Sequence, residues 1–162
     1  MCIRDRSNNN TWKSCVKTVV SSTYNFADTL YLGLQINSLC PFMELDIQAP
    51  ILRRCFDSDI YVYYSNTGTQ IAKDAYIDIQ LDSLFEFVGS TKPITSQIGN
   101  SYRFNLGDVA EGFSGFFKIT IKVSCNARLG QLHCVEAHIY PDTSCLNSAN
   151  AHIQTTANCL GD

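Results

Sequence analysis

Hydrophobic and polar residues alternate along most of the chain, and the period of the alternation is two nearly throughout. Segment 75–81 places alanine, isoleucine or leucine at every second position, with tyrosine, aspartate and glutamine between them. The longest alternation covers 117–123, where phenylalanine, isoleucine and valine are separated by lysine and threonine. Successive side chains of a β-strand point to opposite faces, so this pattern predicts half-buried strands. No segment carries a convincing helical stripe.

The alternation predicts seven strands between residues 42 and 140, each bounded by turn residues. Asn66-Thr67-Gly68-Thr69 supplies one turn, in which we expect Gly68 to adopt a positive φ, and Gly99-Asn100 supplies another. Short strands separated by regular turns are typical of an antiparallel β-sandwich. We therefore predict an all-β, Ig-like antiparallel β-sandwich with strands at 42–48, 59–64, 75–81, 84–88, 102–106, 116–124 and 132–140.

Cysteines recur with a similar spacing about one domain length apart. Cys40 precedes Cys145 by 105 residues, and Cys55 precedes Cys159 by 104. A pair that recurs at such a period indicates tandem modules, with one complete repeat and partial repeats on either side. Residues 1–7, which include Cys2, match no structural pattern and are interpreted as a non-native scar. The expected divisions are the end of a preceding β repeat at 8–40, the complete repeat at 41–146, and a linker with the start of the next repeat at 147–162.

Composition narrows the class of protein. A hydrophobic content of 45% with 17% charged residues is typical of a globular domain and argues against disorder. The net charge of −3 at pH 7 offers no basic surface for nucleic acid. The chain has no run of eighteen apolar residues, so we expect no membrane-spanning helix.

Seven cysteines remain once the scar is set aside, and none of them forms a Cys-x-x-Cys pair. Wide spacing without such doublets favours disulfides, and hence an oxidising compartment. The alternative, that several are buried free thiols, stays open. Strand directions counted along the chain predict two disulfides at opposite ends of the sandwich, Cys125–Cys134 and Cys55–Cys145. Cys15–Cys40 is then the leftover candidate pair.

One cluster invites a catalytic or metal-binding interpretation. Cys134, Glu136 and His138 share one face of a predicted strand and carry three ligand types that metals use. Side chains two residues apart on a flat strand are ~7 Å apart and diverge, which favours a solvated sheet face instead. A cysteine–histidine nucleophile meets the same objection. Calcium bound between modules is a further hypothesis, which rests on four aspartates in turns: Asp57, Asp59, Asp108 and Asp142.

Tyr61, Tyr63 and Tyr76 lie on predicted outward faces and suggest a ligand-facing aromatic platform. Sugars stack on such platforms, so these residues are the candidate site for a carbohydrate. The competing interpretation is that they pack against cross-strand neighbours, as aromatic residues on sheets commonly do.

Five segments together resemble a bacterial Ig-like surface repeat, the "conserved repeat domain". They are Cys40-Pro41, Leu52–Phe56, Tyr63–Thr69, Tyr102–Val109 and Gly130–Pro141. The resemblance covers about residues 40 to 146 and implies a β-sandwich that occurs in tandem in large secreted or cell-surface proteins, often with a C-terminal sorting domain. It carries no catalytic residue. Members of the family often have cysteine where this chain has Ser65 and Ser114, so a disulfide between those positions is absent here.

The residues and the resemblance together predict a non-catalytic structural repeat of an exported bacterial surface protein. It would act as a spacer, stalk or adhesion module at an extracellular or cell-surface location. The alternative function is a carbohydrate-binding accessory module of a secreted enzyme. The expected partners are neighbouring repeats of the same chain, and a surface polysaccharide or a host or cell-surface protein. Calcium is the one candidate cofactor, and nucleic acid is not an expected partner.

Overall fold

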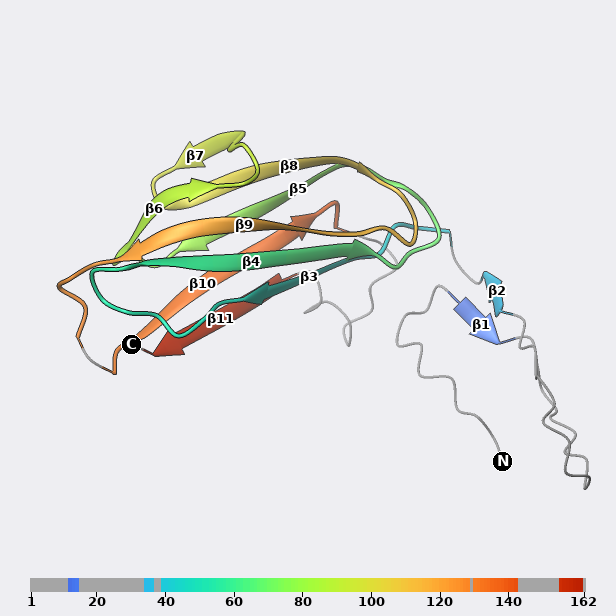
Figure 1. Ribbon diagram of the computed structural model, residues 1–162. Coiled ribbons are helices and arrows are strands. Elements are labelled where there is room, and N and C mark those ends of the chain that lie inside the picture. The colour runs from blue at the N-terminus through green and yellow to red at the C-terminus, as the bar shows by residue number, and fades with distance from the viewer. Residues whose placement is uncertain (1–11, 15–33, 37–38, 129, 143–154, 162) are drawn as a thin grey trace, which may run out of the picture.

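The computed structural model describes residues 12–14, 34–36, 39–128, 130–142 and 155–161 (Figure 1). These residues are all-β and include no helix, so none of them forms a helix that could cross a membrane. The strands are β1 (Trp12–Ser14), β2 (Leu34–Ile36), β3 (Met43–Gln48), β4 (Asp57–Asn66), β5 (Ala72–Leu81), β6 (Phe85–Ser90), β7 (Ser96–Ile98), β8 (Ser101–Val109), β9 (Ser114–Val123), β10 (Leu132–Tyr140) and β11 (Thr155–Gly161).

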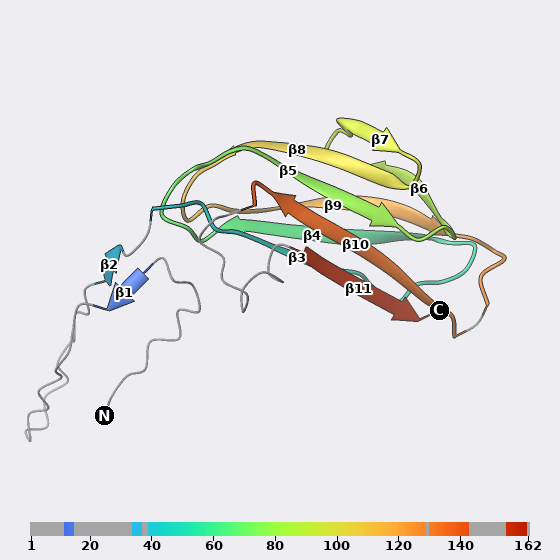
Figure 2. The same cartoon turned by 180° about the vertical axis from the view of Figure 1, so that it is seen from behind.

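Two antiparallel sheets pack face to face, as Figures 1 and 2 show from opposite sides. One sheet has the strand order β3-β4-β9-β6, and the other has the order β11-β10-β5-β8-β7. Strands β1 and β2 pair with each other in a separate two-stranded sheet. The predicted fold class, an Ig-like antiparallel β-sandwich, is confirmed.

The inward positions of both sheets form a single apolar core. Ile77 and Ile79 of β5 face Ile119 and Ile121 of β9, and all four are at most 2% exposed. Phe104 and Phe117 meet across the two sheets with their ring centroids 4.9 Å apart. Burial of each such side chain contributes on the order of 2 kcal/mol, so the alternation read from the sequence supplies the main stabilising term.

Asn66 closes one end of the sandwich from inside. Its side chain is fully buried, and its Oδ1 accepts the backbone N–H groups of Phe42 and Gly68, each at 3.1 Å. Its Nδ2 donates to the carbonyls of Gln70 and Val109 at 2.8 and 3.0 Å. The Asn66 side chain thereby joins the segment that enters β3 to the loop between β4 and β5 and to the end of β8.

Gly68 follows in the predicted turn, but its φ is not positive, so the expected reason for glycine was wrong. A Cβ built there would lie 2.3 Å from the nitrogen of Phe42 and 2.5 Å from the carbonyl oxygen of Cys40. Glycine is required because another backbone segment passes directly over this turn. Gly99, in the second predicted turn, does have a positive φ of 58°.

Both predicted disulfides were wrong in their pairing. The structure joins Cys55 to Cys125 and Cys134 to Cys159. The error has one cause: the short strand β7 has no hydrophobic alternation and was omitted from the count. Omission of one strand reverses the expected direction of every later strand. Cys125 therefore lies at the same end of the sandwich as Cys55. Cys40 is also disulfide-bonded, whereas Cys15 and Cys145 lie outside the described residues.

Segment 155–161 was predicted to belong to the linker and the next repeat, and this was wrong as well. It forms β11, which pairs antiparallel with β10 and places Cys159 directly opposite Cys134. Asn158 Nδ2 also donates to the carbonyl of Ile47 at 2.9 Å, so β11 joins its sheet to the β3 edge of the other sheet. The proposed preceding repeat at 8–40 stays a prediction, and most of it lies outside the described residues, as do 1–7 and 147–154.

Candidate binding surface

Three aromatic side chains gather on the outer face of the four-stranded sheet. Tyr61 and Tyr63 point outward from β4, because Ile60, Val62 and their in-phase neighbours fill the core. Phe116 of β9 lies directly opposite Tyr63, and the two ring centroids are 5.7 Å apart. Phe116 is 63% exposed, and the two tyrosines are 37% and 38% exposed. We call Tyr61, Tyr63 and Phe116 the aromatic patch.

Two carboxylates border this patch on the neighbouring strand. Glu44 and Asp46 point outward from β3, and Asp46 lies directly opposite Tyr63. The carboxylate of Glu44 accepts a hydrogen bond from the Ser65 hydroxyl at 3.4 Å, and that of Asp46 accepts one from Gln48 Nε2 at 3.0 Å. No lysine or arginine among the described residues forms an ion pair with either carboxylate. We call Glu44 and Asp46 the acidic edge.

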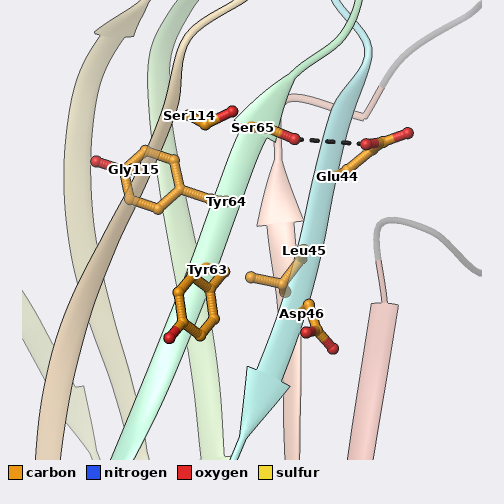
Figure 3. A pocket seen from close by; sticks show the side chains of 8 residues that line it. All are labelled: Glu44, Leu45, Asp46, Tyr63, Tyr64, Ser65, Ser114 and Gly115. Carbon is orange, nitrogen blue, oxygen red and sulfur yellow. Dashed lines mark hydrogen bonds between the residues drawn. The ribbon is translucent and has the colours of Figure 1, made fainter.

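A hollow of about 400 Å³ lies where the patch meets this edge (Figure 3). Its wall comes from strands β3, β4 and β9. Gly115 makes room for the Tyr64 ring, since a Cβ at this position would be 2.8 Å from the Tyr64 hydroxyl. Burial of that ring raises the pKa of Tyr64. The lining residues are Glu44, Leu45, Asp46, Tyr63, Tyr64, Ser65, Ser114 and Gly115.

On the other side of the patch, the charges of Lys118 and Asp59 neutralise each other. Lys118 Nζ lies 3.0 Å from Asp59 Oδ2, and the Thr120 hydroxyl donates to Asp59 Oδ1 at 2.7 Å. The hydrogen bond from Thr120, followed by the one from Lys118, lowers the pKa of Asp59. Next to the patch, the unpaired charge is therefore negative and lies along β3. The exposed Lys122 lies farther along β9, opposite Asp57 of β4 and Glu86 of β6.

The predicted platform of three tyrosines was wrong in one member. Tyr76 belongs to β5 and lies on the outer face of the other sheet, where its ring stacks on Tyr140 at 4.5 Å. The Arg103 guanidinium lies 4.2 Å above the Tyr76 ring centroid and forms two 2.7 Å hydrogen bonds with Asp78. The hydrogen bonds to Asp78 raise the pKa of Arg103. Sequence alternation assigns residues to faces but does not say which sheet carries them.

The Cys134, Glu136 and His138 hypothesis is not supported by the geometry. Cys134 forms a disulfide with Cys159, so it cannot supply a thiolate as ligand or nucleophile. His138 is hydrogen-bonded through Nδ1 to the Thr155 hydroxyl and through Nε2 to Asp142 at 2.7 Å.

The four aspartates of the calcium hypothesis do not gather at one place: Asp57 and Asp59 are two residues apart on β4, Asp108 is on β8, and Asp142 follows β10. Asp59 binds Lys118 and Thr120, Asp108 accepts the backbone N–H of Asp74 at 3.1 Å, and Asp142 binds His138. Within the described part of the chain, no three His, Cys, Asp or Glu side chains are grouped as a metal site would require.

Phe116 was missed as a site residue. The signal was available, because Phe116 and Phe117 are adjacent and must point to opposite faces of a strand. Phe117 is 4% exposed and belongs to the core, which leaves Phe116 on the surface beside Tyr63. The acidic edge lies beside the patch only through the pairing of β3 with β4, which local periodicity does not specify.

No protein-family model and no curated protein matches the chain. Solved structures are similar in fold. The CARDB domain of the PF1109 protein of Pyrococcus furiosus, in complex with di-metal ions, is 8% identical, with a TM-score of 0.52 over 75% of this chain and 87% of that one. The sixth cohesin of the Acetivibrio cellulolyticus scaffoldin B, in complex with a dockerin, is 12% identical, with a TM-score of 0.50 over 74% of this chain and 97% of that one. These similarities show the fold, and membership of the conserved repeat family stays a prediction.

Proposed function

We propose that this chain is a non-catalytic spacer module of an exported bacterial surface protein, which transmits tension between its neighbours with little extension. The two disulfides carry this proposal, through their position relative to the ends of the sandwich.

The chain enters the sandwich at one end and leaves at the other. Met43, the first residue of β3, lies opposite Asn66 at one end, whereas Gly161, the last residue of β11, lies opposite Leu132 at the far end (Figure 1). Modules connected through such ends add their lengths in series, as a spacer requires.

The disulfides shorten the covalent path between these ends. Cys55–Cys125 closes a loop with a sequence separation of 70, which contains β4 to β9 entirely. Cys134–Cys159 closes a second loop, with a separation of 25, which contains most of β10 and β11. Tension entering at β3 would pass through both cystines and bypass the residues inside these loops. β3 is the sandwich strand that lies outside both loops.

Disulfides persist in oxidising compartments, which supports an extracellular or cell-surface location. The sequence resemblance supports neighbouring repeats as partners. The cohesin cited above was solved in complex with a dockerin, which supports a binding role for sandwiches of this shape. The carbohydrate-binding alternative is less well supported, because Tyr76 lies on a different sheet from Tyr61 and Tyr63.

Single-molecule pulling of the oxidised chain from its two termini tests the proposal. Replacing Cys55 and Cys125 by serine should add about 250 Å of extension on unfolding, from the 70-residue separation at ~3.6 Å per residue. Replacing Cys134 and Cys159 by serine should add about 90 Å, from the separation of 25. The two variants control each other because their increments differ. Equal extension in the parent and both variants would overturn the proposal.

A further inference from the structure

We propose that the outer face of the four-stranded sheet docks a protein partner that presents an arginine beside an apolar side chain. The arginine would lie against Tyr63 with its guanidinium on Asp46, and the apolar side chain against Phe116. This function goes beyond that of a spacer, and it does not depend on the disulfides.

The aromatic patch has the features of a binding centre. Phe116, the most exposed of its three rings, contacts Tyr63 and remains 63% exposed. Contiguous exposed aromatic surface on a soluble domain marks interaction sites, and tyrosine contributes strongly to protein interfaces. The patch is rigid, because β4 is paired on both sides, with β3 and with β9. A partner would therefore lose little free energy in ordering it.

The other sheet shows which chemistry suits an aromatic ring next to a carboxylate. There, Arg103 lies over the Tyr76 ring and bonds Asp78 through two nitrogens, so one guanidinium satisfies both groups. Asp46 and Tyr63 present the same pair of groups on directly opposed positions of β3 and β4. No arginine among the described residues stacks on Tyr63 or pairs with Asp46. An arginine from a partner could therefore bind both groups.

Charge argues against a second copy of this chain as the occupant. A symmetric dimer through this face would enclose both acidic edges in one interface, because a two-fold interface uses the same patch on both subunits. Charge also favours a basic partner over a neutral one, since Glu44 and Asp46 have no cation among the described residues. The hollow beside Tyr63 gives room for the long arginine side chain (Figure 3).

Selection of random phage-displayed peptides on the oxidised chain tests the proposal. The selected peptides should be enriched in arginine next to leucine, isoleucine or phenylalanine. Phe116→Ser and Asp46→Asn should each weaken the binding of a selected peptide about tenfold, the effect of losing one central contact. Affinity should also fall as salt is raised, because an ion pair contributes.

Leu132→Ser is the matched control, since Leu132 is 66% exposed and lies on β10 of the other sheet. It should leave binding unchanged, and thermal unfolding should show that all three variants remain folded. Selected peptides without arginine, or equal binding to the parent, Phe116→Ser and Asp46→Asn, would overturn the proposal. Self-association in sedimentation that Phe116→Ser abolishes would overturn it in favour of a dimer interface. Binding to a polysaccharide film through the same residues would overturn it in favour of a carbohydrate site.

Discussion

The backbone N–H of Phe42 donates a hydrogen bond to the buried side-chain oxygen of Asn66 at 3.1 Å. This bond fastens the segment that enters β3 to the end of β4, at the point where tension would enter the proposed spacer. The bond is inaccessible to solvent, so neither partner has water as a substitute.

Asn66→Ala should destabilise the fold by about 3 kcal/mol, because it removes the acceptor of two buried backbone N–H groups and the donor to two carbonyls. Denaturant unfolding measures the loss. Asn105→Ala is the matched control: Asn105 also accepts the N–H two residues ahead, from Gly107 at 2.7 Å, but it is exposed. A loss below about 1 kcal/mol is expected there. Equal losses in both variants would contradict the role assigned to Asn66.

Gly68→Ala should destabilise the fold by about 2 kcal/mol or more, since its Cβ would lie 2.3 Å from the nitrogen of Phe42 and the backbone must move. Gly89→Ala is the control, because no atom lies within 4 Å of a Cβ at that position and its φ is not positive. We expect it to be neutral or slightly stabilising. If both variants unfold at the same denaturant concentration as the parent, the close approach of the two segments is wrong.

Thr120→Val should raise the pKa of Asp59 toward its ordinary value, because the hydrogen bond from Thr120 is the largest cause of its lowering. A lowered pKa in the folded state stabilises the fold above the ordinary aspartate value, and this stabilisation is lost as pH falls through the lowered pKa. Carboxyl NMR titration of Asp59 measures the change. Lys118→Gln should also raise the pKa of Asp59, because it removes a positive charge next to the carboxylate. An unchanged pKa of Asp59 in both variants would contradict the assignment.

Ser65 and Ser114 are directly opposed on β4 and β9, at the positions where members of the resembled family often have cysteine. Ser65→Cys combined with Ser114→Cys should therefore form a disulfide on oxidation and raise the unfolding temperature relative to the reduced variant. Mass spectrometry of the oxidised variant and calorimetry test this. A variant that keeps both thiols free under oxidising conditions would weaken the resemblance.

The alternation was sufficient to predict the sandwich and most of its strands, because inward positions must be apolar in any arrangement of these sheets. It was not sufficient for connectivity. The short strand β7 carries no apolar pattern, and its omission reversed the predicted direction of β9 and β10 and mispaired Cys55 and Cys125. Edge strand β11 begins with two threonines and contains only one large apolar residue, Leu160. It was mistaken for a linker because a strand at the edge of a sheet can form with few buried apolar side chains.

Part of the candidate site could be predicted from the sequence. Tyr61 and Tyr63 are two apart on one strand, so local periodicity was enough to place them together on a surface. Phe116 and Asp46 join them only through the pairing of β4 with β9 and with β3. Such pairings between distant segments depend on the whole topology, and no local pattern in the sequence specifies them.

Non-reducing peptide mapping of the exported chain tests the central claim most directly. The account predicts peptides that join Cys55 to Cys125 and Cys134 to Cys159, since these two bonds define the short path for tension and hold β11 in the sandwich. Peptides that join Cys125 to Cys134, or free thiols at these four positions, would contradict both the strand order at this end and the proposed spacer function.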